Sequence, residues 1–283
     1  MNRTEQIAKA EAFRAMHDRS RILVLPNAWD AASACVFEEA GFKAIATTSS
    51  GVANALGYPD GQVIPRGEML FMIGVVTRSV RVPVTADIES GYADDLATLK
   101  ETIKMVIDAG AIGINLEDSM TNRGAPILEI DNAIARVRAA REAAQAAGVP
   151  LVINARTDVY LHGIGDRESR FDDAVRRVNA YRAAGADSLF VPGVRDAAVI
   201  GKLAAALTGP MNILAGPGSP SVSELEKLGV ARVSVGGGPA RAAITATRKV
   251  AKELFEHGTY NSFTEGVISH PDANALMTRP TPA

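Results

Sequence analysis

Three acidic side chains follow two neighbouring apolar runs of this chain. Asp87 and Glu89 stand two residues apart at the end of the run Pro83–Ile88, and Glu117 directly follows the next run, Ala111–Leu116. Residues two apart on a strand point the same way, so these carboxylates are expected to share one pocket. Three carboxylates repel one another unless protons or a cation neutralise them. The oxygen-only ligand set favours Mg²⁺, or alternatively Mn²⁺, with one or two ligands acting through water.

A second reading of acids at strand ends is that they only cap the helices that follow. We disfavour it for the trio and favour it for Asp118 and Asp158 taken singly. Arg156 ends a further apolar run, and its planar guanidinium can bind a substrate carboxylate or phosphonate through two parallel hydrogen bonds. An internal salt bridge to one of the acids is the alternative role for Arg156.

Other polar or closely approachable positions follow the remaining runs. The hydroxyls and backbone N–H groups of residues 48–51 suit an anionic oxygen, although a plain turn explains them almost as well. Gly236–Gly238 is either an anion loop or a tight turn before a helix, and His162 is either catalytic or a solvated loop residue. Asn212 stands near the start of its run and is a weaker candidate. The expected substrate-binding set is Trp29, Thr48, Ser49, Ser50, Gly51, Asp87, Arg156 and Asn212.

Eight short apolar runs must position these residues, and each precedes an amphipathic segment. Runs rich in Val, Ile and Leu without polar alternation are typical of parallel strands covered on both faces. Eight such pairs predict a (β/α)8 barrel, whose active site lies at the carboxyl ends of the strands. The expected strands are Arg21–Pro26, Lys43–Thr48, Pro83–Ile88, Ala111–Leu116, Pro150–Ala155, Asp187–Val191, Pro210–Ala215 and Ala231–Val235. The expected helices are 29–41, Arg66–Ser79, Asp94–Ala109, Glu129–Ala147, Arg170–Ala184, Asp196–Leu207, Ser221–Leu228 and Ala240–His257.

The bulk composition fits one globular domain over residues 1–283, with a short N-terminal helix and a helical tail that includes Ser262–His270. Hydrophobic residues make up 47% and the net charge is −2, so neither nucleic acid nor an anionic membrane is expected as a partner. The single cysteine, Cys35, precludes an intrachain disulfide and suits the cytoplasm. The four histidines are scattered, which disfavours a zinc site.

Several motifs occur in one order along residues 20–245 and are specific when taken together. They are LPNAWDAASA (Leu25–Ala34), TTSSGVANALGYPDG (Thr47–Gly61), ADIESGY (Ala86–Tyr92), INLEDS (Ile114–Ser119), INARTD (Ile153–Asp158) and ARVSVGGGP. On these residues the chain resembles the isocitrate lyase/phosphoenolpyruvate mutase superfamily, in particular its small bacterial members similar to the mutase or to methylisocitrate lyase.

The resemblance implies a (β/α)8 barrel whose last helix is exchanged between subunits, in a tetramer or a dimer. It implies Mg²⁺ held by Asp87, Glu89 and Glu117, and a small carboxylate or phosphonate substrate held by Ser50, Gly51 and Arg156. It also implies a recurrent active-site acid at the position of Asp60. The shared chemistry makes or breaks a bond next to a pyruvate-like unit through an enolate, which a cation and an arginine can stabilise. Arg156, Asp60 and Glu117 are the catalytic candidates.

This sequence departs from the family pattern at several places. The isocitrate-type lyases carry a cysteine in the loop after the fourth strand, where this chain reads DSMTNRGAPILE; Cys35 lies elsewhere and is expected in the core. The mutase has an aromatic residue at the place of Thr48 and uses an asparagine for which Asn122 is the nearest match. Better-known members have Asp-x-Asp where this chain has Asp87-x-Glu89.

Three functions follow from this pattern. The first is an Mg²⁺-dependent carbon–carbon lyase that cleaves or decarboxylates a 2-oxo or 2-hydroxy di- or tricarboxylate, as oxaloacetate decarboxylase and methylisocitrate lyase do. The missing loop cysteine slightly favours decarboxylation, because water can protonate the enolate. The second is a mutase or hydrolase acting on the P–C bond of a phosphonate such as phosphonopyruvate. The third is an idle barrel that binds a dicarboxylate without turnover.

Overall fold

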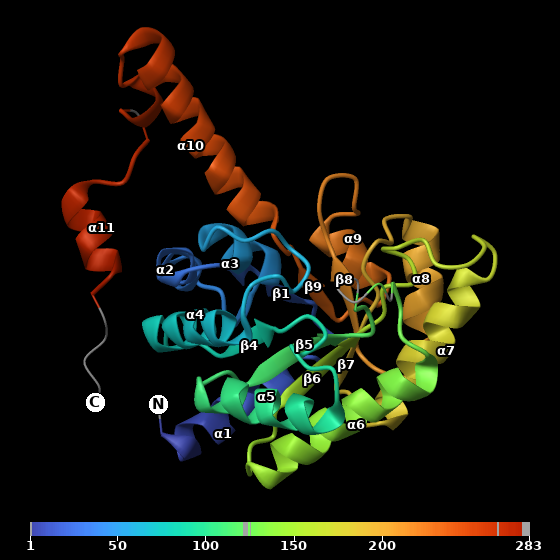
Figure 1. Cartoon of the computed structure of the whole chain (residues 1–283). Helices are drawn as coiled ribbons and strands as arrows, with labels where there is room; N and C mark the ends of the chain where they lie inside the picture. Colours follow the sequence, from blue (N-terminus) through green and yellow to red (C-terminus); the bar gives the residue numbers. More distant parts are fainter. Residues whose placement is uncertain (1, 121–123, 125, 265, 279–283) are drawn as a thin grey trace.

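The barrel predicted from the sequence is present in the computed structural model, which describes residues 2–120, 124, 126–264 and 266–278. All strand pairs are parallel, in the order β1-β9-β8-β7-β6-β5-β4-β3-β2, and the helices surround them (Figure 1). The strands are β1 (Leu23–Leu25), β2 (Asn27–Ala28), β3 (Ile45–Thr47), β4 (Val84–Asp87), β5 (Gly113–Glu117), β6 (Val152–Arg156), β7 (Ser188–Phe190), β8 (Met211–Leu214) and β9 (Arg232–Ser234).

The nine strands correspond to eight barrel positions, because β1 lies within the predicted run Arg21–Pro26 and β2 continues directly after that run. Only Pro26 separates them, and proline has no N–H to donate to a ladder. The first half pairs with β9, where Leu23 lies opposite Arg232, and the second half pairs with β3, where Ala28 lies opposite Thr47. The chain therefore closes the sheet at Pro26, and the predicted (β/α)8 fold is confirmed.

Several helices begin where the sequence provides a capping side chain. Asp30 accepts a hydrogen bond from the N–H of Ser33 at 2.7 Å, and Asp95, Asp196 and Ser221 cap their helices in the same way. The described helices are α1 (Arg3–Ala15), α2 (Ala31–Glu39), α3 (Ser49–Ala55), α4 (Arg66–Ser79), α5 (Leu96–Asp108), α6 (Ile130–Ala146), α7 (Arg170–Ala183), α8 (Ala197–Ala206), α9 (Val222–Lys227), α10 (Gly238–His257), the 3₁₀ turn η2 (Asn261–Phe263) and α11 (His270–Leu276).

Two ends of the barrel are distinguished by what covers them. Helix α1 lies across the amino ends of the strands: Gln6 Nε2 donates to the carbonyls of Ile107 and Ala111 at 2.7 and 3.0 Å, and Phe13 is fully buried beside Gly113. The opposite, carboxyl ends carry the loops that hold the candidate site. The layout thus leaves one end closed by a helix and the other built from loops, as the barrel rule expects.

The C-terminal segment differs from its prediction. A helix over Ser262–His270 was expected, but the structure has η2 at its start and α11 only from His270 onward. The hydroxyl of Ser269 accepts the N–H of Asp272 and Pro271 occupies the first turn, and these features start a helix rather than end one. Helix α10 extends away from the barrel and α11 returns to pack against α2 (Figure 1). Among the described helices, none is both long and apolar enough to cross a membrane.

Candidate active site at the carboxyl ends of the strands

Asp87 ends β4 and is almost fully buried. Its Oδ2 accepts the backbone N–H and the hydroxyl of Ser49, at 3.1 and 2.9 Å, and its own N–H donates to Thr47 Oγ1 at 2.9 Å. Its second oxygen, Oδ1, is buried and has no hydrogen-bond partner within the described part of the chain. A buried carboxylate oxygen without a donor costs free energy. This oxygen is therefore the point where a bound cation, or a water held by one, fits the site.

Glu117 and Arg156 end the neighbouring strands β5 and β6 and lie opposite each other in the register. Arg156 Nη1 lies 2.9 Å from Glu117 Oε2, and the rest of the guanidinium is held by Asp158, with Nε at 2.6 Å from Oδ1 and Nη2 at 3.1 Å from Oδ2. The guanidinium carbon also lies 5.7 Å from the centre of the Phe190 ring. The internal salt bridge considered for Arg156 is therefore present, and its role in binding substrate stays a prediction.

Glu89 does not continue β4, although the two-residue spacing predicted a shared strand face with Asp87. The strand ends at Asp87, and Glu89 has a left-handed backbone with φ of 50°. Tyr92 has a φ of 52° and its hydroxyl donates to Glu89 Oε1 at 2.9 Å. Left-handed backbone at non-glycine residues is uncommon and gathers at functional sites. The turn, rather than strand alternation, sets where Glu89 points.

Gln62 holds this turn from the loop between α3 and α4. Its Oε1 accepts the hydroxyl of Ser90 at 2.8 Å and the N–H of Tyr92 at 3.2 Å, and its own φ is 59°. Among the described residues, the three non-glycine positions with positive φ are thus Gln62, Glu89 and Tyr92. All three belong to one hydrogen-bonded unit beside the acids.

The acids outnumber the cations around this pocket, and their titration reflects it. Burial, with the charge of Asp87 second, raises the pKa of Glu89 to about 8. Burial also raises the pKa of Glu117 well above its ordinary value, although Arg156 opposes the shift. Burial alone lowers the pKa of Arg156, but Glu117 and Asp158 more than offset it, so the pKa is raised. Such a site favours an added cation.

The donor set fits Mg²⁺, although the side chains do not converge as a closed cage. No group of three or more His, Cys, Asp or Glu side chains among the described residues is arranged to hold a metal ion. Glu117 is turned to Arg156, and Glu89 is turned to Tyr92. Among the described residues, the open oxygen of Asp87 is thus a direct ligand that the geometry offers, and a site with few direct ligands suits an ion that keeps most of its waters. The ligand roles of Asp87, Glu89 and Glu117 stay predictions.

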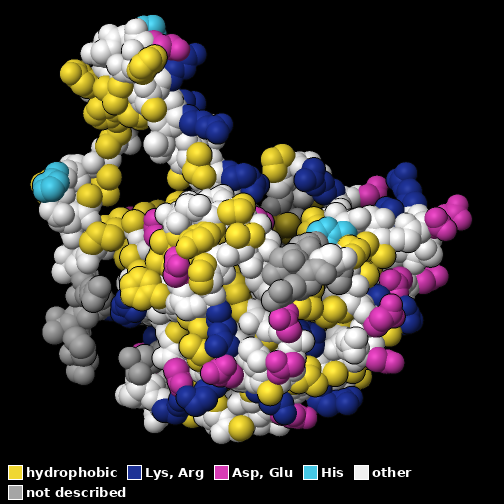
Figure 2. Space-filling model, viewed as in Figure 1, with side chains coloured by type: hydrophobic (Ala, Val, Ile, Leu, Met, Phe, Trp, Pro, Cys, Tyr) yellow, Lys and Arg dark blue, Asp and Glu magenta, His cyan; other side chains and the backbone are white. Residues whose placement is uncertain are grey.

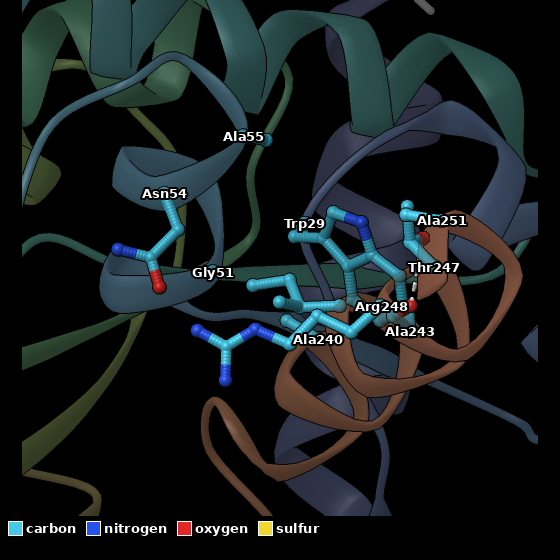
Figure 3. A pocket seen from close by; sticks show the side chains of 10 residues that line it. Trp29, Gly51, Asn54, Ala55, Ala240, Ala243, Thr247, Arg248 and Ala251 are labelled. Carbon is cyan, nitrogen blue, oxygen red and sulfur yellow. Dashed lines mark hydrogen bonds between the residues drawn. The ribbon is translucent and has the colours of Figure 1, made fainter. Parts of the chain in front are cut away.

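Ser50, Gly51 and Trp29 lie where α3 meets α10. A Cβ at Gly51 would stand 2.9 Å from Trp29 Cβ and 3.1 Å from Ala240 Cβ, and one at Gly237 would stand 2.4 Å from Ser50 Oγ. Trp29 points into a cavity of about 370 Å³ between these helices (Figure 3). Its other lining residues are Gly51, Asn54, Ala55, Ala240, Ala243, Ile244, Thr247, Arg248 and Ala251.

The remaining candidates, Thr48, Asn212 and Asp60, lie in three different surroundings. Thr48 is the N-cap of α3, and its hydroxyl lies 3.1 Å from Ser50 Oγ. Asn212 is fully buried in the barrel and bonds Ser234 at 3.3 Å. Asp60 is exposed and lies within electrostatic reach of Asp87 and Arg156. The substrate-binding and catalytic roles of these residues stay predictions.

The glycine-rich run after β9 forms a turn. Asn27 Oδ1 accepts the N–H groups of Val235 and Gly236 at 2.8 and 2.9 Å, and Pro239 lies in the first turn of α10. These bonds form a tight turn before the helix, and anion binding by Gly236–Gly238 stays a prediction. Cys35 is buried in α2, with Sγ 3.6 Å from the Ser79 carbonyl oxygen, so its expected place in the core is confirmed. Asn122 lies outside the described residues.

Asp118 and Asp158 are not helix caps, contrary to the interpretation favoured for them. Asp118 accepts hydrogen bonds from the hydroxyls of Thr157 and Tyr181, both at 2.7 Å, and from the N–H of Asp158 at 3.0 Å. Thr157 and Asp158 directly follow β6 and Tyr181 lies on α7, so the sequence around Asp118 gave no signal for these partners. Asp158 could have been found, because it stands two residues after Arg156 along the same strand direction. Tyr92 and Gln62 were missed as well.

Comparison with known proteins agrees with this geometry. An uncharacterised protein of Mycobacterium tuberculosis is 34% identical over 86% of this chain and 88% of its own length. An oxaloacetate decarboxylase of Pseudomonas aeruginosa is 30% identical over 89% of this chain and 88% of its own length. Both alignments span most of this chain and most of the relative.

Solved structures give the same picture. A Burkholderia cenocepacia protein, described only in general terms as a lyase or mutase, is 41% identical, covers 96% of both chains and superposes with a TM-score of 0.89. A phosphonopyruvate hydrolase complex with oxalate and Mg²⁺ shares the fold, with 24% identity, a TM-score of 0.84 and coverage of 95% and 94%. Residues 13–255 match the family described as phosphoenolpyruvate phosphomutase. The chain belongs to this family, within the isocitrate lyase/phosphoenolpyruvate mutase superfamily.

Proposed function

We propose that this protein is an Mg²⁺-dependent carbon–carbon lyase that releases a pyruvate-type enolate from a small 2-oxo or 2-hydroxy acid. The observation that carries the proposal is the unpartnered, buried Oδ1 of Asp87, on the strand next to that of Glu117, which pairs with Arg156. Mg²⁺ bound there would act as a Lewis acid towards oxygens of the substrate. Similarity to an oxaloacetate decarboxylase, at 30% identity, is consistent with carbon–carbon bond cleavage.

Other residues of the chain orient the side chains that would bind the metal ion and the substrate. Ser49 holds Asp87 through two hydrogen bonds, so the open oxygen of that carboxylate is fixed in direction. Arg156 is held on one side by Asp158 and on the other by Glu117. Exchanging Glu117 for a substrate carboxylate would keep the guanidinium paired while placing its charge where the enolate develops. Burial of these groups strengthens each interaction.

The test is an assay of the purified protein with Mg²⁺ against oxaloacetate, methylisocitrate and phosphonopyruvate in turn. Pyruvate formation from oxaloacetate or methylisocitrate, abolished by chelation and restored by Mg²⁺, is the expected result. The absence of turnover on any 2-oxo or 2-hydroxy acid would contradict the proposal. Arg156→Lys serves as the matched variant, because it keeps the charge and loses the planar fork.

Phosphonate chemistry is the second candidate, since the matched family is named for a phosphomutase. Phosphorus NMR of the phosphonopyruvate reaction separates the two: a new phosphate ester or free phosphate signal identifies P–C bond chemistry. Tight binding of a dicarboxylate with no product from any substrate would instead identify an idle barrel.

We further propose that α10 and the segment after it pack on a second copy of the chain. Of the twenty residues of α10, Ala240 alone is buried. Apolar side chains gather on the projecting arm (Figure 2), including Phe255, which is 93% exposed, and Tyr260, Val267 and Ile268. An apolar surface of this kind marks an interface. Light scattering of the full chain is expected to give a dimer or tetramer, and Phe255→Glu to give smaller species; a monomeric wild-type protein would contradict this.

A further inference from the structure

His162 stands at the mouth of the barrel in contact with two residues of the site. Its Nε2 lies 3.2 Å from Ser119 Oγ and 3.6 Å from Asp158 Oδ2. The backbone N–H of His162 also donates to the carbonyl of Asp158 at 2.9 Å, so the ring is tied to the residue that orients Arg156. Ser119 comes two residues after Glu117, the acid that pairs with the same arginine. These contacts link the imidazole to the Glu117–Arg156 pair from both strands.

His162 is partly exposed to solvent, whereas the two residues that it contacts are buried. The His162 side chain is 30% exposed, whereas Ser119 is 3% exposed and Asp158 is fully buried. A proton can therefore pass between solvent and the imidazole, while the hydroxyl beside it stays shielded. A neutral hydroxyl that both accepts and donates can pass that proton inward.

The other histidines of the described chain, the cysteine and Tyr92 are placed elsewhere or already engaged. His17 lies under the barrel against Phe13, His257 and His270 belong to the C-terminal arm, and Cys35 is in the core of α2. The Tyr92 hydroxyl is committed to Glu89. Asp60 remains as a competing acid, and the test below includes it.

We propose that His162 supplies the proton that converts the enolate to product, and that Ser119 relays it. This inference rests on the proposed lyase function and specifies its protonation step. When the carbon–carbon bond of a 2-oxo diacid such as oxaloacetate breaks, the bonding pair enters the enolate of pyruvate and the carboxylate leaves as carbon dioxide. The enolate carbon then takes the proton of the Ser119 hydroxyl, the serine oxygen takes one from Nε2 of the imidazolium, and the neutral imidazole regains a proton from water.

The reverse step provides a test that needs no knowledge of the natural substrate. With Mg²⁺ in D₂O, the enzyme is expected to exchange the methyl hydrogens of pyruvate. The C–H proton leaves through Ser119 to a neutral His162, its electron pair stays in the enolate, and a deuteron returns by the same route. Proton NMR of pyruvate measures this exchange directly.

The variants are His162→Gln, which keeps a hydrogen-bonding group but cannot carry the proton, and Ser119→Ala. Each is expected to slow exchange by about 100-fold or more, the usual size of a general acid–base effect. His270→Gln is the matched control, because that histidine also touches a polar side chain, Asn274 at 3.1 Å, on the arm. The affinity for oxalate with Mg²⁺, measured by calorimetry, is expected to be unchanged in all three, which separates a proton role from a structural one.

The outcomes distinguish this inference from the function on which it rests. If the wild-type protein cleaves a 2-oxo acid and His162→Gln exchanges pyruvate at the wild-type rate, the relay is overturned and the lyase stands. The same holds if Asp60→Asn alone abolishes exchange. If the wild-type protein neither cleaves nor exchanges, both proposals fall.

Discussion

Both ends of this barrel bury ionisable groups, but the surroundings of these groups differ. The mouth is the carboxyl-end site of Asp87, Glu117 and Arg156, and the floor is the end covered by α1. At the mouth, Asp87 keeps one carboxylate oxygen open. At the floor, Arg232 is fully buried and is met by neutral groups: Asn115 Oδ1 at 3.3 Å, His17 Nε2 at 3.5 Å and the ring of Phe13 at 5.8 Å. No salt bridge of Arg232 is formed within the described residues.

The difference separates a binding site from a sealed structural end. Helix α1 carries Phe13, and His17 directly follows the helix, so the floor is closed by the chain itself. Burial lowers the pKa of Arg232 to about 9 and that of His17 to about 3. At the mouth, burial instead raises the pKa values of Glu89 and Glu117. Unpaired negative charge at the carboxyl ends of the strands favours binding of a ligand. Unpaired positive charge at the opposite end is shielded from solvent by α1.

The largest effect on activity is expected from a substitution of Arg156 at the mouth. We expect Arg156→Lys to lower kcat/KM by about 10³-fold, because the amine cannot hold two carboxylates and the substrate as the planar fork does. Steady-state kinetics on whichever 2-oxo acid is turned over measures this. A fall of less than about threefold would show that Arg156 serves only the salt bridge.

Low pH should lower the stability of the folded protein through protonation of His17 at the floor. Its pKa is lowered from 6.5 to about 3, first by burial and then by the charge of Arg232. Between these values the unfolded chain binds the extra proton, so stability is complete above about pH 6.5 and is lost as the pH falls towards 3. The loss attributable to His17 is on the order of 4 kcal/mol. Urea denaturation across this range measures it, and His17→Gln is expected to flatten the dependence.

Removing the floor cation should alter stability but not metal binding. Arg232→Met is expected to cost about 1–3 kcal/mol, because Asn115 and His17 lose a donor. Its Mg²⁺ affinity, measured by calorimetry, should stay within about threefold of wild type, a range well below the 10-fold or larger effect of disturbing a ligand's support. A large loss of Mg²⁺ affinity would show that the two ends are not independent.

The smallest effect is expected from Tyr92→Phe, which tests the role of Glu89 at the mouth. It deletes the hydroxyl that orients Glu89 and leaves the ring. We expect about a 10-fold loss of Mg²⁺ affinity, as for other groups that orient ligands, with thermal stability nearly unchanged. Equal affinity in both proteins would mean that Glu89 does not take part in holding the ion.

The sequence predicted those features that depend on local pattern. The strand runs and the acids at the strand ends needed only periodicity and neighbouring residues. The break of the first strand at Pro26 and the left-handed turn at Glu89 were missed, because both depend on pairing with distant strands or loops. Gln62 had no signal at all, since its role comes from bonds to Ser90 and Tyr92. Asp118 was misassigned for the same reason, because its partner Tyr181 lies on α7.

The most direct test of the central claim is Mg²⁺ binding by the wild-type protein and by Asp87→Ala, measured by calorimetry without substrate. The account predicts that wild type binds Mg²⁺ and that the variant loses at least about 100-fold in affinity, more than a supporting group would cost. Circular dichroism should show the same fold in both proteins. Equal Mg²⁺ affinity in the two proteins would contradict the account.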